Sequence, residues 1–168
     1  MEQVKRTDSS TDENVPRLEV VIEIPRGSLL KRGSTGTLDF VSPLPCPYNY
    51  GSVPAYIGLE GDLLDALVLG PRLAAGSRVT VYAYGAVGLS DRGLYDDKLI
   101  CADKPPTRLQ RLLVTLFFRI YGRAKGLLNL FRGRPGRTAY AGWFSADDAI
   151  ARAQPLNPGE WQGPQVPF

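Results

Sequence analysis

The spacing of apolar residues changes near residue 103, and this change limits the folds open to the chain. Before it, short apolar runs stand between Gly and Pro turns, and residues 17–24 alternate in polarity as strands do. After it, apolar residues recur at helical spacing between Pro106 and Gly122, at Leu109, Leu112, Leu113, Leu116, Phe117 and Ile120. The pattern predicts an α+β protein, with a small β-barrel followed by an amphipathic helix.

We expect one domain over residues 17–154, between two irregular ends. Residues 1–16 are polar and mixed in charge, which predicts a disordered N-terminal arm. Residues 155–168 are rich in Pro and Gly, which predicts an irregular C-terminal tail. Further strands are predicted at residues 37–41, 66–69, 78–89 and 98–102. Ser145 is placed to cap a short helix that ends near Ala153, with Asp147 and Asp148 in its first turn.

Composition is that of a soluble globular protein. Hydrophobic residues make up 43% and charged residues 22% of the 168 positions, which is ordinary for a soluble domain. The chain starts without an apolar signal-peptide core, and no apolar run approaches the roughly 20 residues that cross a bilayer. We therefore expect a cytoplasmic location, with Cys46 and Cys101 as free thiols.

Two acidic clusters stand beside predicted strands. The first is Glu60-Gly61-Asp62-Leu63-Leu64-Asp65, before an apolar run at 66–69, and the second covers residues 91–98. Carboxylates that converge at the ends of core strands repel one another unless cations or protons lie between them. The chain has no histidine, so the expected partner is a hard, oxygen-binding cation such as Mg²⁺. The clusters predict a multi-metal phosphate site.

The spacing within each cluster supports this interpretation. Glu60 and Asp62 point the same way in an extended chain, and a turn at Gly61 returns Asp65 to them. In the second cluster Asp96 and Lys98 share one face of a strand, where the lysine can hold a phosphate oxygen. Either cluster alone is equally consistent with solvated turn residues. Together, with Glu23 and Tyr50 upstream, they favour a site.

Several short motifs carry a family resemblance. In chain order they are Val21-Ile22-Glu23-Ile24-Pro25-Arg26-Gly27-Ser28, Pro47-Tyr48-Asn49-Tyr50-Gly51, Glu60-Gly61-Asp62-Leu63-Leu64-Asp65-Ala66-Leu67-Val68, the spaced set Asp91, Asp96 and Lys98, Phe117-Phe118-Arg119-Ile120-Tyr121, and Gly142-Trp143. From about Val20 to Trp143 the chain resembles the soluble family I inorganic pyrophosphatases.

The resemblance implies a five-stranded barrel like the oligonucleotide-binding (OB) fold, with flanking helices, and Mg²⁺-dependent hydrolysis of pyrophosphate. It also implies a homo-oligomer. By position, it implies that the metal residues are Glu60, Asp65, Asp91, Asp96 and, in an outer role, Glu23. It implies that Asp62 is the general base and that Tyr50 supports the nucleophile. The phosphate-binding residues that it implies are Arg32, Lys98 and Tyr121.

Departures from the family pattern fall mainly at positions where the family has phosphate-binding residues. Glu60 stands where the family has aspartate, and Leu63 where it has proline. Leu38 replaces an expected arginine and Gly122 an expected lysine, although Arg119, Arg123 or Lys125 can supply charge nearby. Three functions remain open: a divergent pyrophosphatase, an enzyme acting on an organic diphosphate, and a non-catalytic relative that binds metal or a partner.

Basic residues are concentrated after the last predicted barrel strand. Residues 104–137 hold nine basic residues and no acidic one, within a net charge of +3. A cationic amphipathic helix can bind anionic membranes, and a basic barrel can bind single-stranded nucleic acid. The simpler interpretation is that the apolar stripe packs on the barrel, so we expect neither partner. Burial or exposure of the stripe separates the two interpretations.

Overall fold

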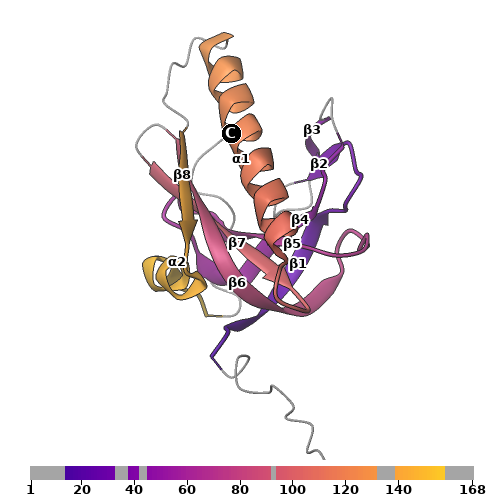
Figure 1. Ribbon diagram of the computed structural model, residues 1–168, viewed down its shortest axis with the longest axis vertical. Helices are drawn as coiled ribbons and strands as arrows, with labels where there is room; N and C mark the ends of the chain where they lie inside the picture. The colour runs from indigo at the N-terminus through magenta and orange to yellow at the C-terminus, as the bar shows by residue number, and fades with distance from the viewer. Residues whose placement is uncertain (1–13, 33–37, 42–44, 92–93, 132–138, 158–168) are drawn as a thin grey trace, which may run out of the picture.

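The computed structural model describes residues 14–32, 38–41, 45–91, 94–131 and 139–157, and its centre is a closed five-stranded β-barrel (Figure 1). The ring follows the order β1, β4, β5, β7 and β6, and closes where β1 pairs with β6. These strands are β1 (Arg17–Ile24), β4 (Asn49–Ile57), β5 (Leu63–Val68), β6 (Arg78–Asp91) and β7 (Leu94–Ala102). All neighbouring pairs in the ring are antiparallel except β5 and β7, which are parallel. The predicted OB-like barrel is confirmed.

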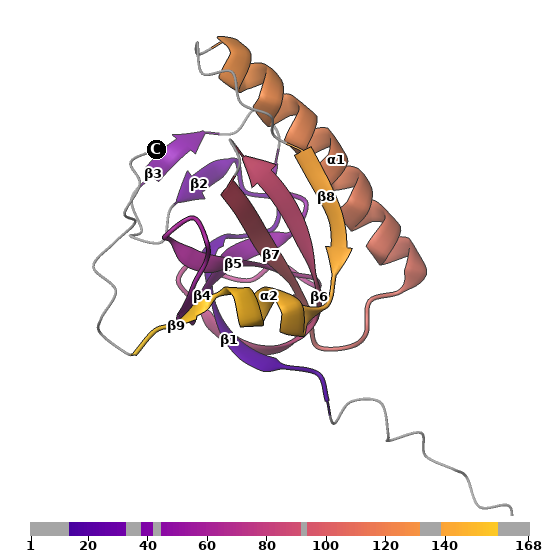
Figure 2. The same cartoon turned by 90° about the vertical axis from the view of Figure 1, so that its left-hand side faces the viewer.

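The remaining elements lie around this ring (Figure 2). A further strand, β8 (Ala139–Phe144), pairs with the far half of β6. The short strands β2 (Leu30–Arg32) and β3 (Leu38–Val41) pair with each other, and β9 (Gln154–Pro155) pairs with β4. Two flanking helices complete the fold, α1 (Arg108–Phe131) and α2 (Ala146–Arg152).

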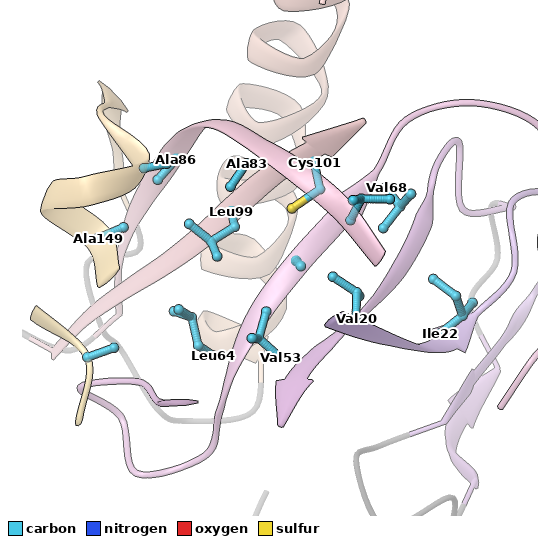
Figure 3. Close-up of a cluster of buried hydrophobic side chains, with 14 residues drawn as sticks. Val20, Ile22, Val53, Leu64, Val68, Ala83, Ala86, Leu99, Cys101 and Ala149 are labelled. Carbon is cyan, nitrogen blue, oxygen red and sulfur yellow. The ribbon is translucent and has the colours of Figure 1, made fainter. Parts of the chain in front are cut away.

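Alternating side chains of the ring strands fill the barrel interior (Figure 3). Val20, Ile22, Val53, Leu64 and Leu99 are almost wholly buried there. Figure 3 shows Ala149 of α2 beside Ala86, so the short helix closes one side of this core. The period-two pattern of β1 arises because every second side chain enters the interior.

A second apolar cluster lies on the outer face of the barrel, beneath α1. Leu67 and Ile100 of the barrel meet Val114 and Phe118 of the helix. The Trp143 indole N–H of β8 also donates to the Thr115 hydroxyl, at 2.7 Å. In both views α1 runs beside β8, and its C-terminal half extends past the sheet (Figures 1 and 2).

The main expectation that the structure overturns concerns α1. The predicted stripe was expected to pack on the barrel, but Leu109, Leu112, Leu113, Leu116 and Ile120 are exposed. Val114 and Phe118 are the buried residues instead. The helix also continues through Gly122, which was expected to end it, as far as Phe131. The helical spacing of apolar residues therefore identified the helix but not the face that packs.

Other strand boundaries differ in detail from the predictions. β1 begins at Arg17 as expected, and α2 has the predicted cap, since the Ser145 side chain accepts from the Asp148 N–H. β2, β4 and β8 were not predicted. Pro155, expected to begin an irregular tail, pairs with Tyr56 in β4. Residues 1–13 of the predicted arm and 158–168 of the predicted tail lie outside the described residues.

Among the described residues, no helix is long and apolar enough to cross a membrane.

Candidate metal centre

The acidic residues lie on the barrel face that α1 also covers. In the parallel pair β5–β7, Asp65 is opposite Lys98. Strand alternation places Asp65 on the same side of the sheet as Leu67, and Asp96 and Lys98 on the same side as Ile100. Because Leu67 and Ile100 belong to the cluster beneath α1, the polar group continues that apolar layer toward the start of both strands.

Three carboxylates converge at this point. Glu60, Asp65 and Asp96 each offer an oxygen atom, and these atoms lie within 4.8 Å of one another. Glu60 comes from the turn before β5, where Gly61 has φ of +86°, a conformation that suits glycine. The turn brings Glu60 to Asp65 as predicted, whereas Asp62, which the same prediction placed with them, is not in the group. Asp96 is almost wholly buried.

Crowding of these carboxylates changes the protonation of Glu60. Burial, followed by the charge of Asp96, raises the pKa of Glu60 from 4.5 to about 8, although Lys98 opposes the change. Such a group binds a proton when no cation is present. The same surroundings favour a bound cation, which relieves the repulsion between the carboxylates. The donor set therefore fits a hard divalent metal.

Lys98 supplies the positive charge that the described group contains. Its ammonium donates to Asp96 at 2.8 Å and also donates to Asp65. Burial lowers the pKa of Lys98, but the charges of Asp65 and then Asp96 outweigh it, and the pKa stands well above its ordinary value. The lysine therefore remains charged at neutral pH, within reach of two of the three carboxylates.

Tyr50 of β4 contacts the same Asp65 oxygen as Lys98. Its hydroxyl donates to Asp65, and its ring centroid is 5.5 Å from the Lys98 ammonium. Burial, followed by the charge of Asp65, raises the pKa of Tyr50 well above 10.0. The phenol consequently stays protonated and orients the carboxylate that it contacts.

Ser52 is a site residue that the sequence analysis missed. It lies opposite Asp65 in the β4–β5 register, and its hydroxyl donates to Glu23 at 2.6 Å. Glu23 lies where the β1–β4 register shifts between Ile22 and Ile24. Glu23 thus stands one strand further from Asp65 than Ser52, consistent with an outer position. A signal was available, because Ser52 lies two residues after Tyr50 and so on the same face of an extended strand.

Asn49 supports the same strand from inside the protein. Its wholly buried amide oxygen accepts from the backbone N–H groups of Arg26 and Leu73, each at 2.9 Å. Its amide nitrogen donates to the carbonyls of Val68 and Pro71, at 3.2 and 2.8 Å. Asn49 therefore fixes β4 to the end of β5 and to the segments that follow β1 and β5, directly before Tyr50.

The other predicted site residues are not part of the group formed by Glu60, Asp65 and Asp96. Asp62 is half-buried, and its carboxylate accepts from the Leu63 N–H at 2.7 Å, outside the group of three. Tyr121 is half-buried in the cluster beneath α1, where its ring stacks on Phe117. The side chains of Arg32 and Asp91 lie outside the described residues.

Asp97 shows how strand alternation separates adjacent acidic residues. It points away from the group of three, and Arg152 of α2 donates to both of its oxygens, at 2.8 and 3.1 Å. The Arg152 guanidinium also lies over the rings of Tyr95 and Phe144. Asp97 therefore holds α2 on the barrel, whereas Asp96 belongs to the metal centre.

Known proteins share this sequence pattern and fold. The sequence model described as inorganic pyrophosphatase matches residues 20–115. A soluble inorganic pyrophosphatase of Oryza sativa subsp. indica is 37% identical over 98 residues, covering 52% of this chain and 46% of the relative. An inorganic pyrophosphatase of Haemophilus influenzae is 28% identical over 145 residues, covering 79% and 82%.

The chain spans about half the length of the first curated relatives that it matches, from 46% to 53%. Structural alignment covers more of both chains than these sequence alignments do. The solved inorganic pyrophosphatase of Helicobacter pylori aligns with a TM-score of 0.64 and 26% identity, covering 84% of this chain and 94% of that one.

Proposed function

The chain belongs to the inorganic pyrophosphatase family, and on that premise we propose that it hydrolyses inorganic pyrophosphate to two phosphates with Mg²⁺. The observation that carries the proposal is the convergence of Glu60, Asp65 and Asp96, with Lys98 beside them. A partly buried cluster of carboxylates next to a lysine can bind both a cation and the phosphate that the cation accompanies.

The donor set decides which metal the site would hold. It offers carboxylate oxygens only, with no histidine in the chain and with Cys101 buried in the barrel interior. Oxygen donors of this kind suit Mg²⁺. Glu60, Asp65 and Asp96 would bind it, with Asp91 and Glu23 as further ligands in our proposal. When bound, such cations lower the pKa of a water molecule and neutralise phosphate charge.

The protein groups have distinct roles in the proposed reaction. Asp62, outside the group of three, is the proposed general base that accepts the proton of the attacking water. Tyr50 holds Asp65 in one orientation through its hydroxyl. Lys98 is the proposed contact to a phosphate oxygen, because it is charged and adjoins both Asp65 and Asp96. Arg32 and Tyr121 are the further proposed phosphate contacts.

The substrate side lacks cations that the family resemblance implies. Gly122 is buried, and a Cβ atom there would lie 3.9 Å from the Tyr140 N–H nitrogen. Arg119, a possible substitute, lies over the Tyr140 ring instead. Each missing charge-assisted contact weakens phosphate binding by about 1.5–3 kcal/mol. We therefore expect a higher KM for pyrophosphate than a family member with those cations would have.

Phosphate release from pyrophosphate with Mg²⁺ tests the proposal. Asp65→Asn should lower the rate at least about a hundredfold, since it removes a ligand that also orders Tyr50 and Lys98. The matched control is Asp103→Asn, the same chemical change at an exposed residue outside the site. It should keep the parent rate. Equal rates for the parent and Asp65→Asn would refute the assignment of this site.

The alternatives make different predictions for the same protein. If Mg²⁺ binds but pyrophosphate is not hydrolysed, organic diphosphates should be tested next, in the same assay and with the same two variants. If no diphosphate is hydrolysed while metal still binds, the non-catalytic interpretation is favoured.

We further propose that the protein is a homo-oligomer of the cytoplasm. Light scattering coupled to gel filtration measures the number of subunits, and a monomer at all concentrations would contradict this part of the proposal.

A further inference from the structure

Asp97 and Arg152 form an ion pair on the side of β7 that faces away from the metal centre. The Asp97 side chain is 4% exposed and accepts two bonds from the Arg152 guanidinium, at 2.8 and 3.1 Å. Asp97 shares its side of the strand with Leu99 of the barrel interior. Asp96 and Lys98 point to the other side. The pair therefore fixes the β7 backbone between two residues of the metal centre.

Two aromatic rings hold the guanidinium in place. The central carbon of the Arg152 guanidinium lies 5.5 Å from the ring centroid of Tyr95 and 5.4 Å from that of Phe144. The two rings meet edge to face, with their centroids 6.0 Å apart. Gly88, opposite Asp97 in the β6–β7 register, makes room for them, since a Cβ atom there would lie 2.9 Å from both rings. Ion pairing and ring packing together restrict the arginine to one position.

The chain after Arg152 reaches a second part of the metal centre. β9 begins two residues later and pairs with the end of β4, where Gln154 is opposite Ile57. The turn that carries Glu60 begins directly after Ile57. Figure 2 shows α2 leading into β9 beside β4. The continuous segment of α2 and β9 therefore contacts the strand that carries Asp96 and the strand that leads to Glu60.

We propose that Arg152 is a positioning residue that keeps Asp96 and Glu60 at the spacing a divalent cation requires. It acts on Asp96 through Asp97 and on Glu60 through β9. Without Arg152, the buried Asp97 would bind a proton or turn toward water, and either change releases the bonds that fix β7. The inference rests on the proposed function, because it takes the same carboxylates as Mg²⁺ ligands.

A role of Arg152 through charge alone predicts the opposite effect on metal binding. Removal of a positive charge leaves the surroundings of the carboxylates more negative, which attracts Mg²⁺ more strongly. Loss of position instead weakens binding, because the carboxylates no longer converge. Contacts that orient metal ligands are worth about ten- to a hundredfold in metal affinity. The sign of the change in Kd therefore separates the two roles.

Calorimetric titration of Mg²⁺ into the metal-free full chain tests the proposal. Arg152→Gln should raise the Kd about ten- to a hundredfold. Arg152→Lys keeps the charge but not the planar two-point contact, so its Kd should lie between those of the parent and Arg152→Gln. The matched control is Arg78→Gln, which breaks the ion pair with Glu19 between β6 and β1 and should keep the parent Kd. An unchanged or lower Kd in Arg152→Gln would overturn the proposal.

A double variant tests whether Arg152 acts through Asp97. Asp97→Asn with Arg152→Gln has the net charge of the parent and leaves neither charge unpaired. Its two amides can bond to each other, so it should recover most of the Mg²⁺ affinity that Arg152→Gln loses. A double variant that binds no more tightly than Arg152→Gln would overturn the proposal.

Urea unfolding and circular dichroism check that each variant is folded under the conditions of the titration. A merely structural role of Arg152 would lower stability and leave the Kd of the folded protein unchanged, which would overturn the proposal. If Arg152→Gln fails to fold, Arg152→Lys takes its place, and a Kd equal to that of the parent would then have the same meaning.

Failure of this inference is distinguishable from failure of the proposed function. The titration measures Mg²⁺ binding without hydrolysis, and loss of binding in Asp65→Asn shows that it reports this site. A parent chain that binds Mg²⁺ but hydrolyses no pyrophosphate would refute the proposed function, while a raised Kd in Arg152→Gln would still support the positioning role. A parent that hydrolyses pyrophosphate, with an unchanged Kd in Arg152→Gln, would give the reverse result.

Discussion

At the scale of single residues, the metal centre depends on a balance of charge in a small space. Three carboxylates lie within 4.8 Å of one another, and among the described residues Lys98 is the cation that contacts them. The balance is incomplete, because the pKa of Glu60 rises to about 8 while Lys98 stays charged. Protons and divalent cations should therefore compete for the same oxygens.

The pH dependence of stability in metal-free protein should reveal this competition. Glu60 binds its proton more tightly in the folded protein than in the unfolded chain. Its contribution to stability is present below about pH 4.5 and is lost as the pH rises to about 8. Glu60→Gln keeps the shape without the ionisation. We expect its free energy of unfolding to decline less over this range than that of the parent.

Urea unfolding in a chelator measures both curves. Groups far from the metal centre titrate alike in the two proteins, so the difference between the curves reports Glu60 together with the neighbouring carboxylates that interact with it. Parallel curves for the parent and Glu60→Gln would mean that Glu60 ionises at its ordinary pKa, and that the carboxylates are further apart in solution.

At the scale of elements, α1 provides a direct comparison between a packed and an unpacked apolar residue. Phe118 is 1% exposed against the barrel, and Leu116, two residues earlier, is 51% exposed. Phe118→Ala should lower the free energy of unfolding by about 3–5 kcal/mol through the cavity it leaves. Leu116→Ala should change it by less than about 0.5 kcal/mol.

Chemical denaturation of the two variants beside the parent checks this prediction. A large loss for Leu116→Ala would show that the stripe is covered in solution. That result would direct attention to a second copy of the chain as the partner that covers it.

At the scale of the whole molecule, the metal centre connects elements that the chain keeps apart. Glu60 precedes β5, Asp96 lies in β7, and Tyr50 in β4 contacts Asp65. A ligand that binds only the folded arrangement stabilises the protein by mass action. Mg²⁺ at a hundred times its Kd should therefore add about 2.7 kcal/mol to the free energy of unfolding.

Thermal unfolding across a Mg²⁺ series measures this effect. Asp65→Asn should lose most of the rise in Tm, and Asp103→Asn should keep it. An equal rise in Tm in the parent and both variants would show that Mg²⁺ binds elsewhere. The proposed role of this site in hydrolysis would then lose its support.

Local patterns in the sequence determined several features. Alternation at residues 17–24 predicted β1, and helical spacing after Pro106 predicted α1. Ser145 with Asp147 and Asp148 predicted the start of α2. A turn at Gly61 was predicted to bring Glu60, Asp62 and Asp65 together, and the structure brings together Glu60 and Asp65. Each of these depends on residues close together in the chain, whose spacing follows directly from strand, turn and helix geometry.

Tertiary structure alone decided the features that depend on contacts between distant segments. Asp96 and Asp97 are neighbours in sequence, yet one enters the metal centre and the other pairs with Arg152. Ser52 reaches Glu23 only because β1 and β4 are paired. The packed face of α1 was misassigned for the same reason. An apolar stripe can be read from the sequence, but which face meets the barrel depends on β8 and the strands beneath it.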